Sequence, residues 1–164
     1  MKHGCLIVSC SRIQLALPIE SVVEVARMVA PCAKLLRAPR YVIGVVDFHG
    51  QLVPLVDLPA RLGLCPPRTP ADLFAGHIVF LELPSGLWGM AVDGVQDLSR
   101  EPMTPLSQAP RHLQGLIQGA LRLADGERAL VLHPSQILSV VIRARISAEL
   151  LALSKPAQPQ GGPA

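Results

Sequence analysis

An internal repeat runs through this chain and limits what it can fold into. Residues 39–44 (PRYVIG) recur as residues 110–115 (PRHLQG), and Pro31 and Pro102 keep the same spacing. Nearer the N-terminus, residues 16–22 (ALPIESV) align with residues 89–95 (GMAVDGV). Each match is short, but agreement in both spacing and order makes chance a poor explanation. The repeat therefore predicts two related structural units in one chain.

Each unit contains predicted β-hairpins. Apolar and polar residues alternate over 13–19, the period of a half-buried strand, which we pair with residues 5–8 across a turn at 9–12. Two β-rich runs, 42–48 and 52–58, flank the turn His49-Gly50-Gln51. Further hairpins are predicted for 78–83 with 87–92 and for 116–123 with 128–133. Pro54 cannot donate to a sheet, so its strand is expected at an edge or a bulge.

The segments outside the hairpins are expected to hold little regular structure. Short helices are predicted at 59–64, 134–138 and 146–153, whereas 65–76 (CPPRTPADLFAG) and 99–112 are expected to be irregular. Residues 155–164 (KPAQPQGGPA) have nothing to bury and are expected to form a disordered tail. The chain is therefore predicted to be all-β, with two small barrels in one domain spanning 1–154. Their approximate halves are 1–66 and 76–145, and strands can cross between them.

Composition narrows the possible functions. The chain is 50% hydrophobic and only 16% charged, which fits a protein that keeps apolar surface for partners, although a large core alone would give the same figures. The net charge of +3 is scattered, so no nucleic-acid partner is expected. No apolar run is long enough to cross a membrane and no secretory signal is recognised. A cytoplasmic protein with reduced cysteines is expected.

Motifs for catalysis or metal binding do not occur in the sequence. The five histidines are dispersed, and there is no P-loop, GxGxxG or GxSxG motif. Asp47 and His49 would share a strand face and could form a general-base pair, but no nucleophile accompanies them, so a polar turn is the preferred interpretation. We therefore predict no enzyme activity, no cofactor and no metal.

Three segments resemble, in order, the CheW-like domain family. Residues 19–25 (IESVVEV) resemble its I-x-x-V-x-E-V segment, and residues 89–95 its G-x-x-V-D-x-V segment. Residues 38–58 (APRYVIGVVDFHGQLVPLVDL) resemble its core motif P-x-x-h-x-G-h-x-N-h-R-G-x-h-h-P-h-h-D-L, in which h is hydrophobic. The resemblance covers roughly residues 5–142. It implies two SH3-like five-stranded barrels side by side, and no catalysis.

Similarity to this family implies a signalling adaptor. Such proteins couple a chemoreceptor (a methyl-accepting chemotaxis protein) to a CheA-type histidine kinase at membrane-associated receptor arrays. They bind the regulatory domain of the kinase, and they bind the cytoplasmic tip of the receptor in a groove between the barrels. Carried over by position, the receptor-binding candidates are Val22, Glu24, Gly44, His49, Gly50, Ile78, Val79 and Gly89.

Several of these candidates have a second interpretation. Val22, Ile78 and Val79 fit the core equally well, and the glycines could serve backbone geometry alone. Asp57 is expected to cap the short helix that follows it. A CheW-like scaffold or regulatory module in a non-chemotaxis two-component system stays open as an alternative function.

The sequence departs from the family pattern at the hairpin turn. His49 stands where family members usually have Arg, which in relatives pairs with the residue that matches Glu24, and Asp47 replaces the usual Asn. A neutral histidine can share one hydrogen bond with a carboxylate but cannot form the two-pronged contact of an arginine. The hypothesis is that His49 weakens, retunes or makes pH-sensitive the receptor contact.

Overall fold

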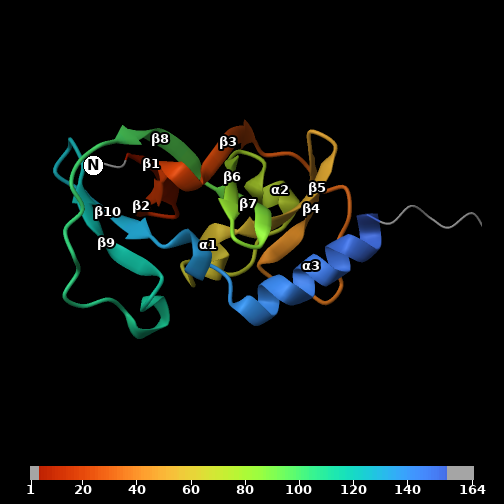
Figure 1. Cartoon of the computed structure of the whole chain (residues 1–164). Helices are drawn as coiled ribbons and strands as arrows, with labels where there is room; N and C mark the ends of the chain where they lie inside the picture. Colours follow the sequence, from red (N-terminus) through yellow and green to blue (C-terminus); the bar gives the residue numbers. More distant parts are fainter. Residues whose placement is uncertain (1–3, 155–164) are drawn as a thin grey trace, which may run out of the picture.

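The computed structural model describes residues 4–154, so the predicted tail at 155–164 lies outside the described residues. Two five-stranded sheets, called sheet A and sheet B, lie side by side, and a helix runs along the outer side of sheet B (Figure 1). Sheet A has the strand order β8-β1-β2-β10-β9, and sheet B has the order β3-β6-β7-β5-β4. The all-β prediction with two small five-stranded units is confirmed.

The strands of sheet A are β1 (Cys5–Cys10), β2 (Ile13–Pro18), β8 (Gly94–Ser99), β9 (Ile117–Arg122) and β10 (Arg128–Leu132). Those of sheet B are β3 (Val22–Arg27), β4 (Val42–Phe48), β5 (Gln51–Asp57), β6 (His77–Leu83) and β7 (Gly86–Val92). The α-helices are α1 (Leu58–Arg61), α2 (Pro70–Leu73) and α3 (Val140–Ser154). Single 3₁₀ turns occur at η1 (Ile19–Ser21), η2 (Arg111–Leu113) and η3 (Pro134–Gln136).

The two sheets repeat one pattern of pairing. Strands β3, β6, β7, β5 and β4 of sheet B correspond in order to β8, β1, β2, β10 and β9 of sheet A. Corresponding neighbours run in the same relative direction, including a parallel pair in each sheet. The sequence halves 1–66 and 76–145 do not coincide with the sheets, because β1 and β2 pair with β8 and β10 rather than with the other strands of their own half. The repeat is structural, but its units exchange strands. Gly44 also corresponds to Gly119 in the sheets, rather than to Gly115 as the match of 39–44 with 110–115 implies.

Several local predictions need correction. Pro54 lies in an interior strand rather than at an edge, since β5 sits between β7 and β4. The parallel ladder with β7 begins only at Leu55, so the missing N–H of Pro54 falls just before it. The segment 65–76 contains helix α2, and α3 begins at Val140 rather than at 146. The Thr69 side chain accepts from the Asp72 N–H and so caps α2. The hydroxyl and N–H of Thr69 donate to the Asp72 carboxylate and hold its pKa below its ordinary value.

Apolar side chains form three clusters. The shared core lies between the sheets and takes alternate residues of each, among them Leu6 and Val8 from β1 and Val79 and Leu81 from β6. The residues that alternate with these point to the other side of each sheet and form two separate clusters. We call the cluster on sheet A the sheet A core and the cluster on sheet B the sheet B core. Cys5 and Cys10 are buried, and burial raises the pKa of both thiols, so they pack as small hydrophobic residues.

Candidate functional site

His49 and Glu24 meet across the open side of sheet B. Glu24 lies on β3 and His49 at the tip of the β4–β5 hairpin, and β3 and β4 are the two edge strands of the sheet. The His49 Nε2 atom is 3.3 Å from the nearer carboxylate oxygen of Glu24, and the two side chains are 72% and 45% exposed. A pair this exposed contributes about 0–1 kcal/mol to stability. It is therefore better placed to present polar groups to a partner than to hold the fold.

The hairpin turn itself explains why His49 sits at the tip. His49 and Gly50 both have positive φ, 50° and 87°, and Phe48 pairs with Gln51 on either side of them. Two consecutive residues with positive φ are the requirement of a type I′ turn. Histidine is one of the few non-glycine residues enriched in this conformation. No side chain lies near Gly50, so its role in the turn is conformational.

Strand β3 presents apolar residues to solvent beside this pair. Val23 is 49% exposed and Val25 is 38% exposed, and they flank Glu24. A bulge between Val22 and Glu24 interrupts the pairing with β6, and the pairing is regular again from Glu24 to Val25. Side chains on both faces of β3 reach solvent here because β3 is an edge strand. We call Val23, Glu24, Val25 and His49 the β3 surface. Sequence alternation could not find Val23 and Val25, because the bulge interrupts it.

The eight residues carried over from the family divide into two groups. Glu24, His49 and Gly50 are exposed and close together, and Val22 is half-buried next to them. Gly44, Ile78, Val79 and Gly89 are buried, so none of them offers surface to a partner in this conformation. Ile78 belongs to the sheet B core and Val79 to the shared core, which is the core interpretation that the sequence left open. Gly89 has no side chain, which leaves room for the side chains of Ile78 and Leu55.

A partly buried ion network joins the two sheets. Asp57 is fully buried, and its carboxylate accepts from the Arg68 guanidinium at 2.8 Å and, as predicted for a helix cap, from the Ala60 N–H. Arg68 also donates to Asp93 at 2.7 Å, and the contact with Asp57 raises the pKa of the guanidinium. Asp93 in turn accepts from the backbone N–H of Ser11 in the β1–β2 turn. The segment 65–76, expected to be an irregular loop or linker, thus supplies the residue that connects sheet B to sheet A.

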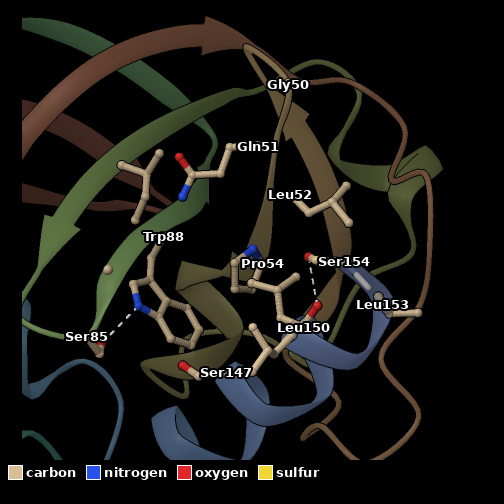
Figure 2. A pocket seen from close by; sticks show the side chains of 13 residues that line it. Gly50, Gln51, Leu52, Pro54, Ser85, Trp88, Ser147, Leu150, Leu153 and Ser154 are labelled. Atoms are coloured by element: carbon tan, nitrogen blue, oxygen red, sulfur yellow. Dashed lines mark hydrogen bonds between the residues drawn. The ribbon is translucent and has the colours of Figure 1, made fainter. Parts of the chain in front are cut away.

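A surface cavity near the tip of the β4–β5 hairpin includes Gly50, one of the exposed candidates, in its lining. It has a volume of about 640 Å³ and is bounded by β5, the β6–β7 hairpin and the C-terminal half of α3 (Figure 2). Trp88 forms part of its wall and donates to Ser85, while Leu150 and Ser147 of α3 face it. Its lining contains no acidic, basic or thiol side chain. The Asp47–His49 pair considered as a general base is exposed on the hairpin and outside this cavity.

Comparison with protein families gives a match over most of the chain. The model of the CheW-like domain matches residues 4–141. Two named relatives are the probable chemotaxis protein CheW of Rhizobium etli and the chemotaxis protein CheW of Rhizobium meliloti. Each is 33% identical over 69 residues, which is 42% of this chain and 42% of the relative. The aligned part thus spans less than half the length of these relatives.

A solved structure shares the fold. The scaffolding protein TtCheW from Thermoanaerobacter tengcongensis superimposes with a TM-score of 0.73, covering 87% of this chain and 91% of that one. The two sequences are only 19% identical, so the likeness concerns the arrangement of the two sheets.

Proposed function

Because this chain belongs to the CheW-like domain family, we propose that it is a non-catalytic adaptor that couples the cytoplasmic tip of a chemoreceptor to the regulatory domain of a CheA-type histidine kinase. The family is one of chemotaxis scaffolds, and its members named above are chemotaxis proteins. Within residues 4–154, no helix is long and apolar enough to cross a membrane. We propose that the protein reaches receptor arrays through its partners.

The β3 surface is the observation that carries this proposal. It places two exposed valines on either side of a carboxylate, with an imidazole 3.3 Å from that carboxylate. A receptor tip is a helical hairpin with an apolar stripe, and a helix of this kind binds an apolar strip that carries a few polar anchors. The exposed candidates Glu24 and His49 belong to it, Gly50 follows His49 in the hairpin turn, and Val22 borders it in sequence. We propose that Gly44, Ile78, Val79 and Gly89 support this surface from within.

Co-elution on size exclusion tests the coupling directly. The protein, the kinase regulatory domain and a receptor-tip peptide are mixed in pairs and then all together. Separate complexes with each partner and one ternary complex are the expected result. If the protein bound neither partner, the coupling function would be contradicted, and a scaffold in another two-component system would be favoured.

A charge introduced into the β3 surface is expected to weaken binding of the receptor tip. Val25→Asp should weaken receptor-tip binding by about tenfold or more, because it puts a desolvated carboxylate against an apolar helix. Val141→Asp, at the exposed N-terminal end of α3, is the matched control and should bind the tip like the wild type. Titration calorimetry measures both affinities, and circular dichroism checks the fold. Equal tip affinity for the two variants would remove the β3 surface from the receptor site.

His49→Arg tests the departure from the family pattern. A histidine shares one hydrogen bond with the Glu24 carboxylate 3.3 Å away, whereas an arginine could hold both carboxylate oxygens. The variant is therefore expected to change receptor-tip affinity by about two- to fivefold, within the range of an exposed ion pair. Titration calorimetry of both proteins at several pH values from 6 to 8 measures the tip affinity. Equal affinities and identical pH profiles for the two proteins would end the hypothesis.

A further inference from the structure

One outer edge of sheet B is covered by a short stretch of chain. Residues 31–38, which we call the sheet B crossing segment, lie against the edge strand β4. The N–H of Cys32 donates to the Val45 carbonyl at 2.8 Å, and the Val45 N–H donates to the Ala33 carbonyl at 2.8 Å. An edge strand leaves such backbone groups unpaired unless another part of the chain covers them. The crossing segment therefore closes this edge through an isolated bridge at Val45.

A helix side chain holds the crossing segment in place. Glu149 of α3 accepts from the backbone N–H of Leu36 at 2.7 Å and from that of Arg37 at 3.3 Å, across 113 and 112 residues of sequence. The Leu36 side chain is 90% exposed, so its own burial does not fix this turn. Leu35 beside it is buried in the shared core. The carboxylate and the buried leucine therefore hold the turn from two sides.

The equivalent segment of sheet A is held differently. Thr104 bridges Ala120 of β9 through its N–H and carbonyl, and its hydroxyl donates to the Ala120 carbonyl at 3.1 Å. Within residues 4–154, no hydrogen bond joins a helix to residues 102–106. The two sheets thus repeat the bridge, and of these two bridges the one in sheet B is connected to a helix.

Helix α3 itself is attached by few side chains. Ile146 is its one fully buried residue, and Ile142 and Leu150 are half-buried against the shared core. Val141 and Leu151 are 67% and 64% exposed. An element with so few buried contacts opens at a lower free energy than the core strands do. Such an opening carries the α3 carboxylate away from the crossing segment.

We propose that Glu149 is a positioning residue through which the docking of α3 controls whether the crossing segment covers β4. With α3 docked, the carboxylate satisfies two backbone N–H groups and the segment stays paired with Val45. When α3 loosens, these N–H groups lose their acceptor, the bridge weakens and the outward backbone groups of Val45 become free. This local opening is independent of the β3 surface and of the proposed coupling function.

Amide hydrogen exchange of the full chain, measured by NMR, tests this control. Glu149→Gln should speed exchange of the Cys32 and Val45 N–H groups by about tenfold, because a neutral amide replaces the charged acceptor. The N–H of Ala120, in the sheet A bridge, should exchange at the wild-type rate. Glu101→Gln removes an exposed carboxylate next to the sheet A segment, and it is the matched control that should leave exchange at Val45 unchanged.

A second change separates control by α3 from a local effect of the carboxylate. Ile146→Val loosens α3 without removing Glu149 and should speed exchange at Val45 by about two- to tenfold. In a chain that already carries Glu149→Gln, the same change should add less than about twofold, because the connection to the segment is gone. Unchanged exchange at Cys32 and Val45 in Glu149→Gln, or effects of the two changes that multiply independently, would overturn the proposal. Exchange that rises equally in both sheets would also overturn it, because the loss would then be one of global stability.

Discussion

Replacing Arg68 with methionine is expected to lower the free energy of unfolding by about 3 kcal/mol, because it leaves a buried carboxylate without its counter-charge. The Asp57 side chain is 1% exposed and that of Arg68 is 21% exposed, so solvent screens the pair weakly. In the variant, Asp57 would keep only backbone donors, those of Ala60 at 3.5 Å and of residue 68 at 3.3 Å. Urea unfolding monitored by circular dichroism measures the change.

Two further variants identify the cause of this loss. Arg12→Met removes an exposed arginine from the β1–β2 turn near the same junction and should change stability by less than about 0.5 kcal/mol. The double variant Asp57→Asn with Arg68→Met removes the buried charge and should recover part of the loss. A loss no larger for Arg68→Met than for Arg12→Met would show that Asp57 does not depend on the guanidinium. The junction between the sheets would then rest on apolar packing alone.

The hairpins of this fold could be predicted because each depends on residues close in sequence. Alternation predicted β2, and the His49-Gly50 turn fixed the β4–β5 pairing. The repeat predicted two related units correctly as well. The expectation that strands can cross between the halves left open which strands do so, because β1 paired with β8 satisfies the same alternation as β1 paired within its own half. Which partner a strand chooses depends on non-local packing, here the shared core between the sheets.

Residues of the candidate site could be proposed from the sequence only where a motif indicated them. Resemblance to the family located Glu24 and His49, and the structure brings them to 3.3 Å. Ile78 and Val79 were proposed from the same resemblance, but both face cores. An apolar residue in a strand gives the same sequence pattern whether it faces a partner or a core. Arg68 was missed because its segment has no periodicity and its two carboxylate partners lie on other elements. An arginine in a proline-rich stretch gives no sign of the buried aspartate that it meets.

Gly119→Ala is expected to destabilise the protein by about 2–3 kcal/mol through a steric clash within sheet A. A Cβ atom built on Gly119 would lie 2.5 Å from the carbonyl oxygen of Thr104 and 2.7 Å from Met103 Cγ. Thr104 is held there because its N–H and carbonyl both bond to Ala120 on the same strand. The backbone oxygen cannot rotate away as a side chain could, so the crossing segment must shift and its bridge must weaken.

Gly44→Ala should cost a similar amount, because the same arrangement recurs in sheet B. A Cβ atom on Gly44 would lie 2.5 Å from the carbonyl oxygen of Ala33, which accepts from Val45. Gly50→Ala is the matched control: nothing lies near its Cβ, so only the positive φ opposes the change, and the cost should be about 1 kcal/mol. Denaturant unfolding of the three variants tests this order. If Gly44→Ala kept wild-type stability but lost receptor-tip binding, Gly44 would be a contact residue rather than the site at which a crossing segment closes the sheet.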